Sequence, residues 1–293
     1  MQDPLHEIAQ ALADAAQTAA AGGFAARAAA AESLEVHALD RLEILAARGA
    51  GAGSLDPLRA RAGALLARWD AANTRVLGRL RARIRAARYT RPGLRRALLR
   101  HGGPAGPSGA YDGLDLLVQG LLAHGVPAEP RAALGPDMVP YQPTPARAIL
   151  ELLERARIGP DDLLVDLGSG LGQVALLTAL LSGARARGVE LEPAYVDYAR
   201  RCAGGLAVPG VEFVHADARA APLRGGTVFY LFTPFKGLLL REVLERLRAE
   251  EGGRPLKICA YGPCVEWVSK QAWLRPAESG AGRGSGVAVF QNL

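Results

Sequence analysis

The sequence predicts an α/β protein in which a doubly wound, mostly parallel sheet follows an all-α N-terminal region. Two observations support this fold class. From Met138 onward, short apolar runs typical of strands alternate with helix-competent segments, which is the pattern of a parallel sheet covered by helices. Before about residue 100, alanine, leucine, glutamate and arginine dominate and β-branched residues are few, which favours helices.

Composition divides the chain into three predicted parts. Residues 1–102 are expected to form a helical accessory domain of two or three long helices, with a break at the glycine-rich segment Gly49–Ser54. Residues 103–137 are expected to be a linker and a capping helix, the helix lying near Tyr111–His124. Residues 138–293 are expected to form the α/β domain.

The overall composition is that of a globular protein, with 49% hydrophobic and 22% charged residues. No apolar run reaches membrane-spanning length and the start lacks a basic leader, so we expect no membrane association and no signal peptide. Cys202, Cys259 and Cys264 are odd in number and show no Cys-x-x-Cys spacing. This argues against a disulfide scaffold and a metal site, and it predicts a reducing, cytoplasmic location.

The central motif of the α/β domain is a strand, a glycine turn and a helix in direct succession. An apolar run that contains Asp166 leads into Gly168, Gly170 and Gly172, and the helix-competent segment Val174–Leu181 follows at once. Such a unit cradles a nucleotide. The spacing is G-x-G-x-G, not the dinucleotide pattern G-x-G-x-x-G, and an acid beside the loop would repel a pyrophosphate. The same acid suits S-adenosyl-L-methionine, which carries an ammonium and a sulfonium.

These residues form a D-x-G-x-G-x-G pattern that resembles the first motif of class I S-adenosylmethionine-dependent methyltransferases. Upstream, Tyr141-Gln-Pro-Thr-Pro145 precedes a predicted helix, and the loop itself reads D-L-G-S-G-x-G-Q. This combination is similar to the non-SET-domain histone lysine methyltransferases, over Tyr141 to about Asp217. The resemblance implies the Rossmann-like fold of that class, with a seven-stranded sheet, and S-adenosyl-L-methionine as cofactor. The alternative interpretation of residues 141–145 is an ordinary loop that leads into a helix.

The carboxyl ends of the next strands supply further expected cofactor contacts. Glu190 ends a strand about 20 residues past the glycine loop, where a carboxylate accepts hydrogen bonds from ribose hydroxyls. After the third strand, Asp217 is expected to accept from the adenine amino group and the Ala218 N–H to donate to a ring nitrogen. His215 is interpreted as a core residue, and Glu192 as the acid at a helix N-terminus. The expected cofactor-binding residues are Tyr141, Thr144, Asp166, Gly168, Ser169, Gly170, Gly172, Gln173, Glu190, Asp217, Ala218 and Phe232.

The methyl acceptor is expected at the loop that follows the fourth predicted strand, within Thr227–Phe235. Many amine methyltransferases carry an Asn or Asp, two prolines and an aromatic residue there, whereas Phe232-Thr-Pro-Phe235 lacks the amide. The departure argues against an adenine or glutamine amide acceptor and suits a lysine side chain or the ring of a small molecule. Tyr141, Thr233 and Phe235 are therefore the candidate catalytic residues, and they would line the acceptor channel.

Three more strands complete the predicted sheet. Leu256–Tyr261 is an apolar run typical of a fifth strand. The region from Trp267 to Leu274 is expected to give the sixth, and Gly286–Phe290 a final antiparallel strand.

The stretch from Arg59 to Arg100 carries thirteen arginines and one acid, Asp70. One interpretation is a docking surface for an acidic partner, either nucleic acid or an acidic protein patch. The other is a solvated face in a chain whose arginine, alanine and glycine content reflects a GC-rich coding sequence. Only Trp69 and Tyr89 are interleaved aromatic residues, so a base-stacking platform is not expected.

Three functions follow from these expectations. The leading hypothesis is an S-adenosylmethionine-dependent N-methyltransferase that acts on a protein lysine, with the helical domain docking the protein substrate. The second is a class I methyltransferase of a small metabolite, in which the helical domain caps the pocket and forms a homodimer. The third is a cofactor-binding module that associates with nucleic acid and has lost catalysis.

Overall fold

The computed structural model describes residues 3–20, 22–107, 109–250, 252–277 and 286–293. The chain separates into two compact units. The helical unit consists of residues 1–83, 96–106 and 111–121, and the sheet unit consists of residues 84–95, 107–110 and 122–293. The predicted limits of the domains, at residues 102 and 137, stay predictions.

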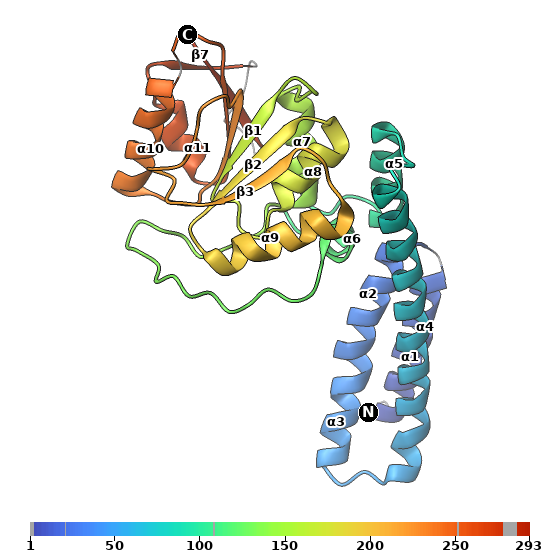
Figure 1. Cartoon of the computed structure of the whole chain (residues 1–293). Helices are drawn as coiled ribbons and strands as arrows, with labels where there is room; N and C mark the ends of the chain where they lie inside the picture. Colours follow the sequence, from blue (N-terminus) through green and yellow to red (C-terminus); the bar gives the residue numbers. More distant parts are fainter. Residues whose placement is uncertain (1–2, 21, 108, 251, 278–285) are drawn as a thin grey trace. The chain divides into compact units, whose positions relative to one another are not determined.

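The helical unit is formed by long helices that run side by side (Figure 1). The break between α3 and α4 falls at residues 48–51, which overlaps the predicted break Gly49–Ser54, and α4 already begins at Ala52. The helices are α1 (Pro4–Ala20), α2 (Phe24–Leu34), the π-helical turn η1 (Glu35–Leu39), α3 (Asp40–Ala47), most of α4 (Ala52–Arg85), and parts of α5 (Arg91–Gly102) and α6 (Gly113–Leu122).

The core of the helical unit follows from helical periodicity. In α4 the buried residues Leu55, Ala62 and Trp69 recur every seven positions, which is close to two turns, so they share one face. They pack against α1 and against the continuous rod of α2, η1 and α3. The residues that these helices contribute are Ile8, Leu12, Ala15, Ala19, Ala30, Leu34, Ala38 and Leu42.

The sheet unit contains a seven-stranded sheet in the order β3-β2-β1-β4-β5-β7-β6. Strands β1 to β5 are parallel, and β7 pairs antiparallel with both β5 and β6. This confirms the predicted doubly wound, mostly parallel sheet and its antiparallel last strand. The strands are β1 (Leu163–Leu167), β2 (Arg185–Glu190), β3 (Val211–His215), β4 (Val228–Phe232), β5 (Lys257–Tyr261), β6 (Leu274–Pro276) and β7 (Ala288–Asn292).

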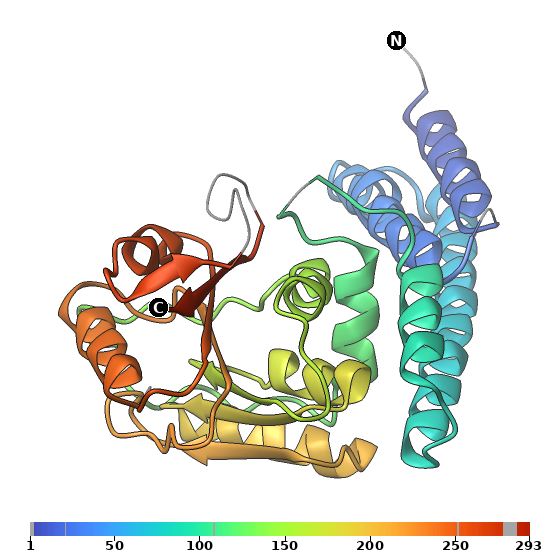
Figure 2. The ribbon, with the colours of Figure 1, turned by 90° about the horizontal axis from the view of Figure 1, so that it is seen from above.

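Helices cover both faces of the sheet (Figure 2). On one face, α10 buries Leu240, Val243 and Leu247 against the strands through side chains such as Val165 and Phe229. The helices of this unit are α7 (Ala146–Arg155), α8 (Gln173–Ser182), α9 (Pro193–Leu206), α10 (Gly237–Glu250) and α11 (Cys264–Ser269). None of the helices in the described ranges combines the length and the apolar character needed to cross a bilayer.

The sixth strand is shorter than the sequence prediction, which was wrong for most of 267–274. The helix α11 occupies the first part of that range, and only Leu274–Pro276 forms β6. The physical reason is a helical spacing that strand patterning did not detect: Cys264 and Val268 lie four residues apart and both face the core.

Trp69 gives a test of the helical core. Its indole is buried, and its Nε1–H has no acceptor among the residues that the structure describes. Trp69→Ala should lower the free energy of unfolding by about 3–5 kcal/mol, because it leaves a large cavity. Trp69→Phe should cost less than about 1.5 kcal/mol, because it keeps most of the volume and removes the unsatisfied donor. Denaturant unfolding followed by circular dichroism measures both; equal losses would contradict this account of the core.

Candidate active site

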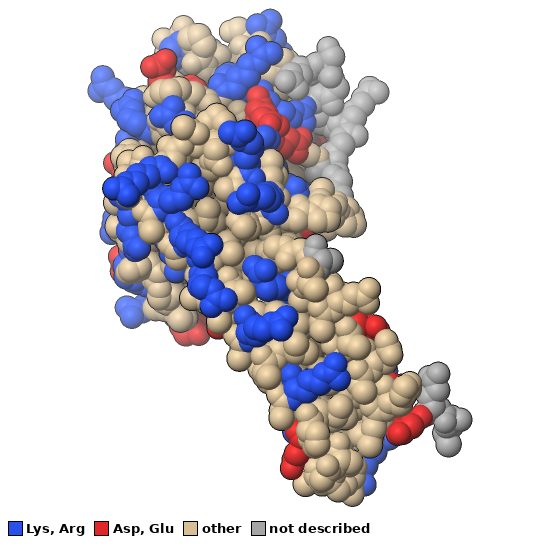
Figure 3. Space-filling model, turned by 90° about the vertical axis from the view of Figure 1, so that its right-hand side faces the viewer, with Lys and Arg blue, Asp and Glu red and all other residues tan. Residues whose placement is uncertain are grey.

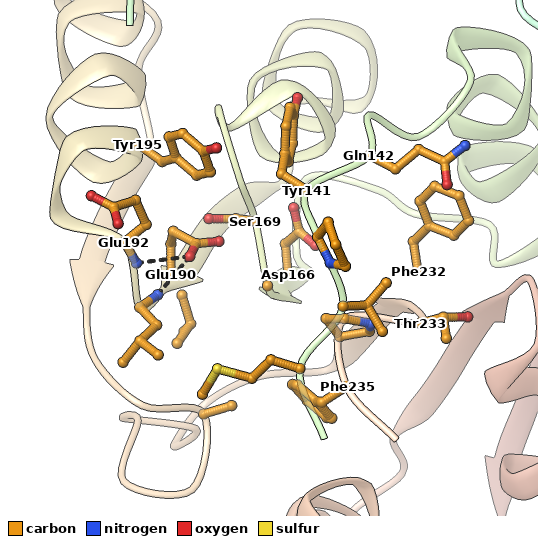
Figure 4. Close-up of a pocket in the computed structure, with 18 of the residues that line it drawn as sticks. Tyr141, Gln142, Asp166, Ser169, Glu190, Glu192, Tyr195, Phe232, Thr233 and Phe235 are labelled. Carbon is orange, nitrogen blue, oxygen red and sulfur yellow. Dashed lines mark hydrogen bonds between the residues drawn. The ribbon is translucent and has the colours of Figure 1, made fainter. Parts of the chain in front are cut away.

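A cavity of about 510 Å³ lies at the carboxyl ends of β1, β2 and β4, where the strand order reverses. Ligands of open α/β sheets bind at this position. Figure 4 shows side chains from the glycine loop, from residues 141–142 and from the loop after β4 around one hollow. The cavity is lined by the predicted residues Tyr141, Thr144, Asp166, Gly168, Ser169, Gln173, Glu190, Asp217, Ala218, Phe232, Thr233 and Phe235. Gly170 and Gly172 do not line it.

Asp166 is the buried acid of the cavity. Its side chain is almost fully enclosed, and its Oδ2 atom has no hydrogen-bond partner in the described part of the chain. Burial, and to a smaller extent the charge of Glu190, raise the pKa of Asp166 to about 8. The Ser169 hydroxyl beside it is also buried without a partner. Two such orphaned polar groups fit a ligand with a cationic, hydrogen-bond-donating end, as S-adenosyl-L-methionine has.

Glu190 is held in place by backbone N–H groups at the end of β2. Its Oε2 accepts from the N–H of Gly170 at 2.8 Å, and its Oε1 accepts from the N–H groups of Leu191 and Glu192, both at 2.8 Å (Figure 4). Oε1 thus accepts two bonds, whereas Oε2 accepts one and retains a second accepting site. Glu190 therefore lies fixed at the cavity, in the position expected of a ribose ligand, and that role stays a prediction.

The glycine loop is packed against protein as well as facing the cavity. A Cβ on Gly168 would overlap Pro234, and a Cβ on Gly170 would overlap the Tyr141 ring. Both glycines also adopt positive φ, at 83° and 50°. The loop thus needs glycine here so that Tyr141 and Pro234 can close over it, a reason that the sequence motif alone does not provide.

Tyr141 belongs to an aromatic and polar wall of the cavity. Its ring lies 5.3 Å from that of Tyr195, at an angle of 57°. Behind it, the Gln173 amide donates to the Thr144 carbonyl at 3.0 Å, and the Thr144 and Tyr230 hydroxyls are 3.2 Å apart. Sequence reasoning identified Tyr141, Thr144 and Gln173 but missed Tyr195 and Tyr230, which only the fold brings to the site.

Asp217 and Ala218 lie at the cavity edge after β3. Hydrogen bonds from Arg219 hold the pKa of Asp217 below its ordinary value, and the closest Arg219 contact is 2.7 Å. From α10, Arg246 donates to the carbonyl groups of Ala218 and Ala221, both at 3.0 Å. The loop is therefore ordered by two arginines, and adenine recognition by Asp217 and Ala218 stays a prediction.

His215 is not a core residue, and that prediction was wrong. Its side chain is exposed, and its Nε2 lies 2.9 Å from the Leu191 carbonyl oxygen. The reason is topological: β3 is the edge strand of the sheet, so no further strand covers it.

The loop after β4 lines the cavity and is held by hydrogen bonds to residues outside the cavity. Thr233 has a φ of 39°, a strained conformation for a β-branched residue. Its hydroxyl donates to the Tyr261 carbonyl at 3.2 Å and accepts from the Cys264 N–H at 3.1 Å. These bonds engage the Thr233 hydroxyl in holding the loop, and the predicted role of Thr233 in lining the acceptor channel stays a prediction. The Phe232 ring lies 4.9 Å from that of Tyr261, tilted by 50°, and Phe235 is buried and lines the cavity.

Residues 130–139, which we call the wall segment, close one side of the cavity. Glu192 caps α9 through the Ala194 N–H, as the sequence predicts, and its Oε2 also accepts from the N–H groups of Arg131 and Ala132, at 2.8 and 2.7 Å. At the other end, Val139 donates to the Pro234 carbonyl at 3.2 Å. Between these anchors, Ala133 and Leu134 line the cavity.

The structure gives no sign of a metal centre in its described ranges. There, no group of three or more His, Cys, Asp or Glu side chains is arranged to hold a metal ion.

The sequence comparison agrees with the position of the site. Residues 140–207 match the family described as "Histone methylation protein DOT1". The match begins beside Tyr141 and includes the glycine loop and Glu190. No curated protein matches the chain.

Three solved structures are similar to part of the chain. An RNA methyltransferase from Salinibacter ruber, in complex with S-adenosyl-L-homocysteine, is 27% identical over 51% of this chain and 92% of its own, with a TM-score of 0.42. A SAM-dependent methyltransferase from Thiobacillus denitrificans, with the same ligand, is 22% identical over 39% of this chain and 48% of its own, with a TM-score of 0.34. A precorrin-6y C5,15-methyltransferase from Geobacter metallireducens is 17% identical over 53% and 92%, with a TM-score of 0.41.

The sheet order, the acid-bearing glycine loop and the family match agree on one class. The chain is an S-adenosylmethionine-dependent methyltransferase with the class I, Rossmann-like fold.

The pKa of Asp166 predicts how pH affects the cofactor-free protein. Because the pKa is about 8 in the folded state and about 4 in the unfolded chain, the folded protein holds a proton that the unfolded one has lost. The free energy of unfolding should therefore fall as pH rises, by about 2 kcal/mol between pH 6 and 8. In Asp166→Asn this contribution should be absent. Denaturant titrations across pH measure both proteins, and parallel curves would contradict the account.

Glu192 predicts how the wall segment is held. Burial alone would raise the pKa of Glu192, but donors from Ala132, Ala194 and Arg131 outweigh it and lower the pKa. In Glu192→Ala those N–H groups lose their acceptor, so hydrogen–deuterium exchange across residues 130–134 should accelerate at least tenfold. The matched variant Glu192→Gln keeps an acceptor oxygen and should exchange more slowly than the alanine variant. Unchanged exchange in Glu192→Ala would show that other contacts hold the segment.

Proposed function

We propose that this S-adenosylmethionine-dependent methyltransferase transfers a methyl group to the side-chain amine of a protein lysine. The observation that carries the proposal is the match of residues 140–207 to a histone methylation family, which coincides with the wall of the cavity that Tyr141 forms.

The composition of the acceptor loop supports an amine on an apolar stem. The loop offers Phe232 and Phe235 where amide-directed enzymes carry a side-chain amide. The wall segment adds Ala133, Leu134 and Met138 to the same cavity. A lysine stem packs against such a surface, and the low polarity favours the neutral amine over the ammonium. The neutral amine is the form that attacks a methyl group.

Methyl transfer depends on the alignment of the donor with the acceptor more than on acid–base catalysis. The cofactor, when bound, supplies an activated methyl group on a sulfonium. In this proposal Asp166 and Glu190, which both line the cavity, hold the cationic and ribose ends of the cofactor, while Tyr141 and Pro234 pack on the glycine loop. In well-oriented systems, holding both reactants in the reactive geometry lowers the activation free energy by about 7–11 kcal/mol.

The helical unit is proposed to dock the protein substrate. The alternative is that it caps a pocket for a small metabolite and mediates a homodimer. The cavity itself is compatible with either acceptor, because 510 Å³ lies within the range of small-molecule sites. The two proposals therefore differ in where the methyl group goes, and they agree on the cofactor.

The decisive experiment follows labelled methyl groups. Purified protein is incubated with methyl-labelled S-adenosyl-L-methionine and an extract of the source cells, and the product is divided by acid precipitation, protease and nuclease. Lysine methylation predicts label in protease-sensitive material that yields methyl-lysine on hydrolysis.

Two variants serve as controls, and other label distributions decide against the proposal. Asp166→Ala and Glu190→Ala should each reduce incorporation at least tenfold, in parallel with their loss of cofactor affinity measured by calorimetry. Label confined to soluble small molecules would favour the metabolite enzyme, and nuclease-sensitive label would indicate a nucleic-acid acceptor. Unchanged cofactor affinity in both variants would remove these acids from the site.

A further inference from the structure

We propose that one face of α4 binds the phosphate backbone of double-stranded DNA. The face is defined by Arg61, Arg68, Arg75 and Arg79, which we call the arginine stripe. All four side chains are exposed and lie within the helical unit. Figure 3 shows Lys and Arg side chains gathered on the side of the molecule where α4 and α5 lie.

The spacing of the stripe places its charges in a row. Successive members are seven, seven and four residues apart, and each interval is close to a whole number of helical turns. The row is about 27 Å long, from eighteen residues at about 1.5 Å each. Asp70 is nine residues from Arg61, or two and a half turns, so it points to the opposite side of the helix. The stripe therefore carries positive charge without an interleaved acid.

The described residues do not neutralise the stripe. None of its four guanidinium groups forms an ion pair with a residue in the described ranges. Another positive charge, Arg27, lies near the stripe. Burial lowers the pKa of Arg27, and the charge of Arg75, a member of the stripe, lowers it further. The pKa of His101 is also lowered, mainly by burial and to a smaller extent by the charges of Arg100 and Arg27. Cations from three helices thus repel one another, and a bound polyanion would relieve that repulsion.

The chemistry of the stripe favours duplex DNA among polyanions. Arginine pairs well with phosphate through its two-pronged donor group. Trp69, the aromatic residue within the stripe's length, is buried in the helical core, so the face has no platform on which unpaired bases could stack. The major groove of B-form DNA admits an α-helix, whereas the major groove of an RNA duplex is deep and narrow, so a row of arginines on a helix face suits DNA. The regular, base-paired backbone of B-form DNA is therefore the partner that such a row fits.

The proposal is tested on the full-length protein by fluorescence anisotropy with a labelled 25-base-pair DNA duplex of mixed sequence. The stripe variant R61Q/R68Q/R75Q/R79Q is compared with R224Q/R241Q/R248Q/R275Q, whose four exposed arginines lie in the sheet unit. Both variants lower the formal net charge from +6 to +2 (6 − 4 = 2), so a difference between them reports position and not total charge.

The wild-type protein should bind with an affinity that falls steeply as salt rises. The stripe variant should bind at least tenfold more weakly, and its slope of log affinity against log salt should be shallower by about three to four, as expected for four lost phosphate contacts. The control variant should stay close to wild type. Melting curves and S-adenosyl-L-methionine affinity, unchanged in both variants, show that the fold is intact.

Three results would overturn the proposal. The first is equal DNA affinity in the two variants, which would make any binding a property of net charge alone. The second is tighter binding to an RNA duplex of the same length. The third is displacement of DNA by polyglutamate at lower concentration than by unlabelled duplex, which would assign the stripe to an acidic protein.

Discussion

The site depends on an acid that the fold buries without a partner. Asp166 lies near the end of β1, lines the cavity and is almost fully buried, and one of its oxygens accepts no hydrogen bond from the described residues. Glu190 brings a second carboxylate to the same cavity. Burial of Asp166, with the charge of Glu190 nearby, destabilises its ionised form, and a cation bound beside it would offset that cost. The structure therefore selects a positively charged ligand before any contact with the acceptor is considered.

The glycine loop connects this electrostatic feature to the acceptor side. Because Gly168 and Gly170 have no side chains, Pro234 and the Tyr141 ring reach the loop from two other segments. Glu192, two residues after Glu190, holds the wall segment. The glycine loop and Glu192 thus contact both the predicted cofactor region and the predicted acceptor region, so a displacement in one region would move residues of the other. Such rigid support is what a reaction that proceeds by alignment requires.

The parts of the site that the sequence predicted are local in the chain. The strand, the turn and the helix from Leu163 onward follow from neighbouring residues, and the acids at the ends of β2 and β3 follow from strand patterning. The parts it missed depend on long-range contacts. The bond from Arg131 to Glu192 spans 61 positions, and Tyr230 reaches Thr144 across 86. His215 was misjudged because the strand order, which makes β3 an edge, is not written in the residues of β3 itself.

The central claim is that a cationic methyl donor binds with Asp166 and Glu190 at its two ends. The most direct measurement is a crystal structure of the protein with S-adenosyl-L-methionine. The account predicts the ligand's amino group on the Asp166 side, with Oδ2 no longer without a partner, and the ribose hydroxyls within hydrogen-bond distance of Glu190. A ligand bound elsewhere, or bound here with both carboxylates turned away from it, would contradict the account.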